Sequence, residues 1–272
     1  MVGNPIVWAI VTARDGIARG LARIGVTPNM LSVFGLGMTV VAGVALALGA
    51  GAPPGWRFDP RPIDAHAANA YLPIAGVLLV LCAAGDMLDG AVARIGGKGS
   101  TFGAFLDSTL DRFSDFAIYL GIAFYFACRG NLTYTFLPFL ATFAGLMISY
   151  TRARAEDLID FCTVGYWQRG ERFAAVLIAV FAANVPALLW QQALSPMFTV
   201  WARIRYTHQV AAGGRPVVDP RESQRLVDKL RLWRYPRKTV PYEIVTVANI
   251  AFLIFARIPA DLDPLGKLLG LP

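Results

Sequence analysis

The chain has 272 residues, of which 56% are hydrophobic and only 16% charged, and its formal net charge is +7. Soluble domains contain about 25% charged residues, so this composition, with a mean hydropathy of +0.52, excludes an ordinary soluble domain and predicts an integral membrane protein. The three cysteines, Cys82, Cys128 and Cys162, are far apart and indicate neither a disulfide framework nor a CxxC metal site.

The first 25 residues predict an amphipathic helix lying in the membrane interface. Apolar side chains recur at helical spacing from Ile6 to Ile24, while Asp15, Arg19 and Arg23 follow another stripe. These charges interrupt the apolar residues and argue against a signal peptide. A short soluble helix packed on the domain is the alternative. We expect Pro28 to break this helix.

Long uncharged runs predict helices that cross the bilayer, since about 20 apolar residues span it. The first four expected spans cover about 30–50, 71 into an aspartate-rich stretch, 103–128 and 132–152, with a Pro-rich loop at 51–70. The next run, 173–202, suits either one long span or two short ones separated near 184–186. Sequence length alone does not decide between them.

Charge favours two crossings in the 173–202 run. Residues 203–240 hold ten Lys or Arg against three Asp or Glu, and the positive-inside rule places such a segment in the cytoplasm. The other basic segments then alternate correctly, which gives an all-α polytopic bundle of about six spans with a possible seventh near 241–258. The basic run also suits a nucleic-acid binder, but anionic lipid headgroups explain it more simply, so we expect no nucleic-acid partner.

Five aspartates lie between residues 85 and 115, in a stretch flanked by apolar runs. Asp86 and Asp89 are three residues apart and Asp107 and Asp111 four apart, so each pair shares one helical face. Carboxylates that converge in a low-dielectric site need protons or cations to offset their charge. All-oxygen ligation suits Mg²⁺ or Mn²⁺, and a shared carboxylate could bridge two ions. The alternative is a solvated acidic loop.

Small and basic residues in the same stretch leave room for a bulky anion. Gly90 and Gly103 keep the helix surfaces open, and Arg94 offers a fork of donors where a phosphate would sit. The sequence has neither a GxxxxGK[ST] loop nor a GxGxxG turn after a strand. A nucleotide would therefore be held by metal ions and the helical pair.

The aspartates belong to a longer pattern: DMLDGAVAR from Asp86, eight further residues, then GAFLDSTLD from Gly103. It resembles the signature of the CDP-alcohol phosphatidyltransferases, DGxxAR(x8)GxxxDxxxD preceded by one more aspartate, and every fixed position matches. The resemblance extends from about Thr27 to at least Arg205. It implies a multi-pass enzyme of the inner membrane, normally a homodimer with six helices per subunit, whose polar cavity opens to the cytoplasm. The expected division is an interfacial helix at 1–25, the enzyme domain at 26–205, a basic cytoplasmic segment at 206–240 and an additional apolar segment at 241–272.

The resemblance also implies an activity and roles for single residues. Such enzymes transfer a phosphatidyl group from CDP-diacylglycerol, or a related CDP-linked lipid, to the hydroxyl of a polar alcohol and release CMP. By this resemblance Asp86, Asp89 and Asp107 would bind two Mg²⁺ or Mn²⁺ ions, and Asp111 would act as general base while touching the second ion. The implied contacts to the CDP-lipid are Gly90, Arg94, Ser100 and the segment Thr27, Pro28, Asn29 and Met30. Taken alone, that segment is also a good helix start.

The acceptor alcohol is indicated by arginines beyond the signature. The sequences SYTRARAE and RGER, with a later arginine, resemble bacterial phosphatidylinositol phosphate synthases, in which corresponding positions hold the acceptor phosphate. Here these positions are Arg152, where relatives often have lysine, Arg172 and Arg205. This implies inositol phosphate as acceptor, with glycerol 3-phosphate and a phosphatidylglycerophosphate synthase as the main rival. Arginines also gather at cytoplasmic helix ends for topological reasons alone.

A function of another class is a divalent-cation or proton-coupled transporter, because buried carboxylates also line ion paths. In a transporter the carboxylates should be distributed along the membrane depth. Here they cluster at the ends of two successive helices, which favours the enzyme.

Overall fold

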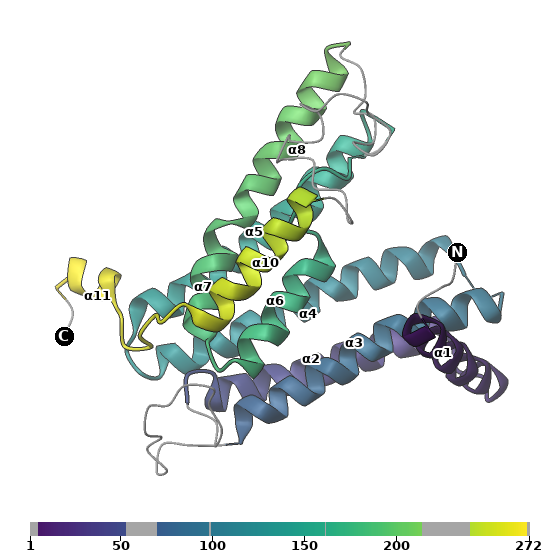
Figure 1. Cartoon of the computed structure of the whole chain (residues 1–272), viewed down its shortest axis with the longest axis horizontal. Coiled ribbons are helices and arrows are strands. Elements are labelled where there is room, and N and C mark those ends of the chain that lie inside the picture. Colours follow the sequence, from purple (N-terminus) through teal and green to yellow (C-terminus); the bar gives the residue numbers. More distant parts are fainter. Residues whose placement is uncertain (1–4, 53–69, 98, 161, 214–239, 271–272) are drawn as a thin grey trace.

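The computed structural model describes residues 5–52, 70–97, 99–160, 162–213 and 240–270. Every regular element in these ranges is a helix, which confirms the predicted all-α class. Figure 1 shows the helices arranged as a long lower group, α2 to α4, and an upper group that leans away from it. The helices are α1 (Pro5–Arg23), α2 (Pro28–Gly49), α3 (Tyr71–Ile95), α4 (Thr101–Ala127), α5 (Leu132–Glu156), α6 (Arg169–Phe181), α7 (Val185–Leu194), α8 (Pro196–Ala211), α10 (Val240–Phe255) and α11 (Pro264–Leu268).

The turn between α1 and α2 differs from the expectation in one detail. Helix α1 ends at Arg23, and Gly25 follows with φ +87°, a left-handed conformation that glycine adopts at low cost. Pro28 instead starts α2, because proline is tolerated in the first helical turn. The Thr27 hydroxyl accepts a hydrogen bond from the Met30 N–H at 3.3 Å and caps the helix. The prediction that Pro28 breaks the first helix was therefore wrong, since the helix has already ended.

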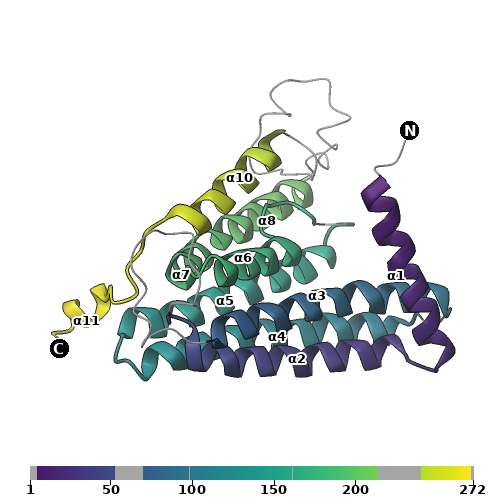
Figure 2. The same cartoon turned by 60° about the horizontal axis from the view of Figure 1, so that its bottom comes forward.

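Helix α1 packs on α3 and crosses the end of the α2–α4 layer at a steep angle (Figure 2). Ala18 is fully buried against Ala91 and Val92. Ile17 and Ile24, from the predicted apolar stripe, are 54% and 77% exposed. Part of this stripe thus faces outward, and the interfacial location of α1 stays a prediction.

Helix α2 packs along both α3 and α4, and small residues permit the close approach (Figure 2). A Cβ on Gly43 would lie 2.6 Å from the Ala117 carbonyl oxygen of α4, too close for any other side chain. On the other contact, the Thr39 hydroxyl lies 2.8 Å from the Cys82 sulfur of α3. Because only five residues separate the end of α3 at Ile95 from the start of α4 at Thr101, the polar end of α3 and the polar start of α4 lie at the same end of the layer.

The chain from 169 to 211 forms three helices in two runs. Helix α6 ends at Phe181, the chain turns through Ala183 (φ +53°), and α7 and α8 follow with only Ser195 between them. The turn falls beside the predicted separation at 184–186. The second run continues to Ala211, past the expected end at 202. The number of membrane crossings itself stays a prediction.

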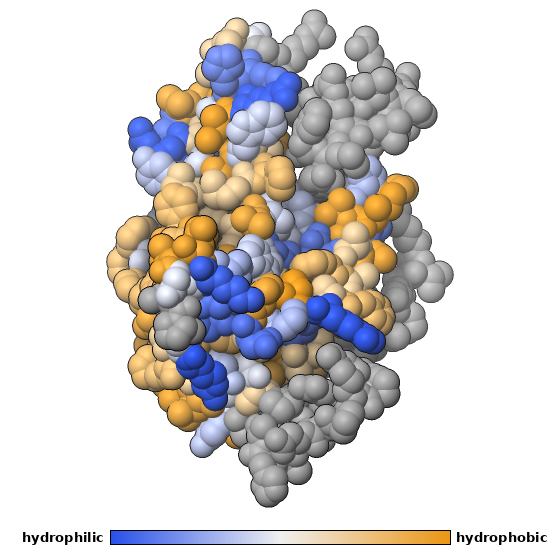
Figure 3. Space-filling model, turned by 90° about the vertical axis from the view of Figure 1, so that its left-hand side faces the viewer, coloured by the Kyte–Doolittle hydropathy of each residue, from blue (hydrophilic) through white to orange (hydrophobic). Residues whose placement is uncertain are grey.

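By length and apolar composition, three of the described helices can cross a membrane: α2, α3 and α5. Large apolar side chains are exposed along α2, including Val33, Val40 and Val44. Figure 3 shows apolar residues over much of one face, interrupted by hydrophilic patches. Such a surface is suited to lipid contact, and the protein is membrane-embedded.

Helix α10 is a shorter apolar helix at the predicted seventh span and packs against α6 and α7. Its Leu253 belongs to the main hydrophobic core, and Tyr242 and Val245 pack against that core. Two predicted segments fall largely outside the described residues: the Pro-rich loop, of which 53–69 are not described, and the basic segment 206–240, of which 214–239 are not described.

Candidate active site

Two links join the aspartate pairs of α3 and α4. The Ser32 hydroxyl of α2 lies 3.3 Å from a carboxylate oxygen of Asp89 and 3.3 Å from one of Asp107. The guanidinium of Arg169, in the first turn of α6, lies 2.8 Å from Asp86 and also forms an ion pair with Asp111. Side chains of α2, α3, α4 and α6 therefore form one polar site.

A third acidic residue on α4 extends this site by one turn. Asp115 accepts a hydrogen bond from Arg172 at 3.0 Å and lies 3.9 Å from the Arg112 guanidinium. Arg112 in turn donates to the Ser149 hydroxyl of α5. Arg172 is only 6% exposed, so its charge requires such a partner. The site is a network of carboxylates and arginines that reaches α5.

Sequence reasoning gave no individual role to Ser32, Arg112, Asp115 or Arg169, although Arg169 belongs to the RGER motif. Two signals could have identified two of them. Asp115 follows Asp111 by four residues and so shares its helical face, and Arg169 precedes Arg172 by three. The other two lie on α2 and on the side of α4 facing α5, where only the packing of helices shows what they contact.

The oxygen atoms of the site are the kind that bind a hard divalent cation, although the carboxylates do not surround a single point in this structure. In the described ranges no three Asp, Glu, His or Cys side chains lie close enough together to hold a metal ion. The site nevertheless offers four carboxylates and a hydroxyl, the oxygen ligands that Mg²⁺ and Mn²⁺ prefer. A positive group already contacts two of them, since Arg169 bridges Asp86 and Asp111. The carboxylates thus face a position that suits cations.

The predicted CDP-lipid residues fall in two places. In the first, the start of α2 meets the start of α4, where a Cβ on Gly103 would lie 3.0 Å from the Ser100 hydroxyl and 3.1 Å from the Asn29 side-chain oxygen. Ser100 also caps α4 by accepting from the Gly103 N–H at 2.9 Å. Thr27 caps α2, Pro28 lies in its first turn, and Met30 is exposed.

In the second place, Gly90 and Arg94 lie one turn apart on α3, next to the aspartates. A Cβ on Gly90 would lie 3.6 Å from a guanidinium nitrogen of Arg94, so glycine leaves the space beside this side chain open. These two residues follow Asp86 and Asp89 on the same helix. A diphosphate near the aspartates would therefore be within reach of α3 donors.

The three predicted acceptor arginines have different surroundings. Arg172 is buried and bound to Asp115, as described above. Arg152, at the end of α5, pairs with Glu156 at 2.8 Å on the exposed surface. The Arg205 guanidinium lies 5.4 Å from the ring centre of Trp201 on the outer side of α8. Among these arginines, Arg172 therefore contacts α4, one of the two helices that carry the aspartates.

A neighbouring arginine fixes the loop that precedes α6. Arg203 of α8 is 1% exposed and donates to the Val164 carbonyl at 3.2 Å and to the Gln168 side chain at 2.8 Å. Thr199 of α8 also accepts from the Trp167 N–H at 3.1 Å. These bonds fix the loop just before Arg169 and Arg172. Arg203 therefore stabilises the position of this loop.

The fold and the site define a class of protein: a membrane-embedded helical protein in which carboxylates and arginines of several helices form one polar site. The family model for CDP-alcohol phosphatidyltransferase matches residues 25–206. The chain belongs to this family and is a transferase of phospholipid biosynthesis. The match ends before α10 and α11, which lie beyond the family region.

Individual relatives point to one branch of the family. Over 166 residues the chain is 38% identical to the archaetidylinositol phosphate synthase of Pyrococcus horikoshii, covering 61% of this chain and 74% of the relative. It resembles the crystal structure of Mycobacterium tuberculosis phosphatidylinositol phosphate synthase with CDP-DAG bound, with a TM-score of 0.61 and 27% identity, covering 75% of this chain and 98% of that one. The same enzyme in complex with manganese and citrate gives a TM-score of 0.57 and 27% identity, covering 72% and 88%.

Proposed function

We propose that the chain transfers a phosphatidyl group from CDP-diacylglycerol to the hydroxyl of inositol phosphate and releases CMP. The observation that carries the proposal is the first turn of α6, where Arg169 and Arg172 both turn toward the aspartates of α3 and α4. A buried arginine beside this site suits an acceptor that already bears a phosphate, because the planar guanidinium can donate two hydrogen bonds to it. The names of the similar enzymes agree with this acceptor.

Asp86, Asp89, Asp107 and Asp111 would hold two divalent ions, Mg²⁺ or Mn²⁺. Bound divalent ions would neutralise the charge of the diphosphate and stabilise the departing phosphate of CMP. The manganese complex of the mycobacterial enzyme supports metal use. Carboxylates and a hydroxyl favour such hard ions over softer ones.

The remaining roles belong to side chains of the chain itself. Asn29, Ser100, Gly90 and Arg94 would bind and orient the CDP part of the donor. Asp111, only 8% exposed, would accept the proton of the acceptor hydroxyl as its oxygen attacks the phosphorus next to the diacylglycerol. The new phosphorus–oxygen bond forms as the bond to the CMP phosphate breaks. Direct in-line transfer requires no covalent enzyme intermediate.

We place the enzyme in the inner membrane with the site facing the cytoplasm, as a homodimer. The excess of Lys and Arg among residues 203–240 supports this orientation, because these residues collect on the cytoplasmic side. Labelling of cysteines introduced between 214 and 239 tests the orientation: reaction with an impermeant reagent from the cytoplasmic side only is the expected result.

Turnover with different alcohols tests the function. The purified protein is given CDP-diacylglycerol and Mg²⁺ with inositol phosphate, glycerol 3-phosphate, free inositol or serine, and CMP release is followed. We expect inositol phosphate to be used best, since a smaller alcohol leaves groups meant for the ring hydroxyls unpaired. Equal or better turnover with glycerol 3-phosphate would assign the chain to the phosphatidylglycerophosphate synthases instead.

A further inference from the structure

The C-terminal segment that lies beyond the family region is docked onto it by directed hydrogen bonds. The Asp263 carboxylate accepts from the Leu132 N–H at 2.8 Å and the Thr133 N–H at 2.9 Å, two of the free N–H groups at the start of α5. The Tyr134 hydroxyl donates to the Pro259 carbonyl at 2.8 Å. These contacts fix the end of the segment that lies by the α5 N-terminus.

Further bonds follow α10 toward its start. The Asn184 side chain donates to the Leu253 and Ala256 carbonyls at 2.8 and 2.7 Å, and so satisfies free carbonyls at the end of α10. Gln191 of α7 donates to the Asn249 side chain at 2.8 Å. Helix α10 thus has a defined position along the surface of α6 and α7.

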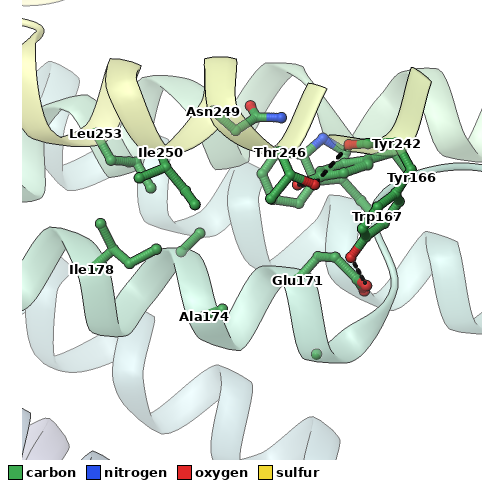
Figure 4. A pocket seen from close by; sticks show the side chains of 12 residues that line it. Tyr166, Trp167, Glu171, Ala174, Ile178, Tyr242, Thr246, Asn249, Ile250 and Leu253 are labelled. Atoms are coloured by element: carbon green, nitrogen blue, oxygen red, sulfur yellow. Dashed lines mark hydrogen bonds between the residues drawn. The ribbon is translucent and has the colours of Figure 1, made fainter. Parts of the chain in front are cut away.

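The start of α10 contacts the turn that carries the site arginines (Figure 4). The Tyr242 hydroxyl donates to a carboxylate oxygen of Glu171 at 2.9 Å, and the Tyr166 hydroxyl donates to Thr246 at 3.2 Å. A cavity of about 320 Å³ lies between α6 and α10 beside these bonds. At this cavity the two hydroxyl bonds join α10 to the first turn of α6 and to the loop before it.

Glu171 lies within the same turn as both arginines. It follows Arg169 by two residues, which places it about 200° around the helix, on the side away from the aspartates. The turn is therefore held on two sides: Arg169 and Arg172 bind α3 and α4, and Glu171 binds α10. The loop before it is held by α8 through Thr199 and Arg203. A rotation of this turn would move both guanidinium groups.

We infer that Tyr242 and Glu171 are positioning residues for the acceptor alcohol: through their hydrogen bond, α10 fixes the orientation of the α6 turn that carries Arg169 and Arg172. This inference rests on the proposed function, in which Arg172 binds the acceptor phosphate. It extends that function to a segment outside the matched family region. The donor contacts on α2, α3 and the start of α4 do not depend on α10.

The test compares two variants that each remove one tyrosine hydroxyl. Y242F deletes the bond to Glu171, and Y134F deletes a bond at the opposite end of the same segment. We expect Y242F to raise the acceptor KM about three- to tenfold, the size of one net hydrogen bond, with the KM for CDP-diacylglycerol unchanged. Y134F should leave both KM values within about twofold. Equal effects of the two variants on the acceptor KM would overturn the inference.

Substitutions of Glu171 test the same hydrogen bond from its other side, even if the Y242F variant does not fold. E171A should raise the acceptor KM as Y242F does, E171Q should raise it less because it keeps an acceptor oxygen, and the double variant should be no worse than E171A alone. Independent, multiplying effects would mean that the two residues act separately and would refute the inference. The proposed function fails differently: the wild-type protein would then not use inositol phosphate better than the other alcohols, whatever residue stands at position 242.

Discussion

Replacement of Arg172 by alanine separates a role in acceptor binding from a role in folding. The side chain is 6% exposed and bound to Asp115 at 3.0 Å. If its guanidinium holds the acceptor phosphate, each charge-assisted hydrogen bond lost costs about 1.5 to 3 kcal/mol, which corresponds to about a 10- to 150-fold rise in the acceptor KM. The KM for CDP-diacylglycerol should change less than about twofold. Initial rates of CMP release at varied concentrations of each substrate give both constants.

The buried ion pair with Asp115 supplies the control. D115N removes the charge of the partner but keeps an oxygen that can accept a hydrogen bond from the guanidinium, so Arg172 should keep its position and the acceptor KM should stay close to that of the wild type. Loss of one member of a buried ion pair destabilises a fold by up to about 5 kcal/mol. Thermal unfolding in detergent measures the loss of stability for both variants. If R172A and D115N lowered stability alike and R172A left the acceptor KM unchanged, Arg172 would be a structural residue and the acceptor assignment would be refuted.

Three further results are expected. D107N should reduce turnover about a thousandfold and weaken Mn²⁺ binding, measured by titration, because it removes the charge of a proposed metal ligand; full activity of the wild type in EDTA would contradict metal dependence. D111N should lower kcat about 100- to 10,000-fold with a smaller change in CDP-lipid binding, because it removes the proposed general base. Desolvation raises the pKa of Asp263, but hydrogen bonds from Thr133, Gly266 and Leu132 outweigh it and lower this pKa from its ordinary value of 3.8 to about 2. A lowered pKa stabilises the fold above about pH 4 and loses this effect toward pH 2, so the difference in melting temperature between wild type and D263N should shrink in that range.

Most helix boundaries could be predicted because local chemistry sets them. Thr27, Ser100 and Asn131 each cap a helix whose apolar run was visible in the sequence. Between 173 and 202 the run is uninterrupted by charge, and there the turn at Ala183 depends on packing that no periodic pattern records. Pro28 was given the break after α1 because proline is a strong signal, whereas the helix ends at Arg23 and the chain turns at Gly25.

The aspartates of the site were predictable because a helix places residues three or four apart on one face. The residues that join them were not, because Ser32 and Arg169 come from other helices and reach Asp107 and Asp111 only after packing. The contacts of α10 lacked a signal for the same reason. The Tyr242 hydroxyl bonds to the Glu171 carboxylate, which is 71 residues away in the chain. Nothing in the sequence distinguishes either residue from a tyrosine or glutamate on an ordinary surface.

The charges of the site agree with the chemistry proposed for it. Five aspartates, from Asp86 to Asp115, and three arginines at 112, 169 and 172 carry a formal charge of −2. One divalent ion would balance this charge. A second ion would leave an excess of +2, and the diphosphate of a CDP-lipid carries two negative charges. Because uncompensated charge is costly in a low-dielectric site, two divalent ions and one CDP-lipid would together match the charge of these side chains. In this balance the arginines reduce the acidic charge enough for two ions and one diphosphate to neutralise it, in addition to the phosphate binding proposed for Arg172.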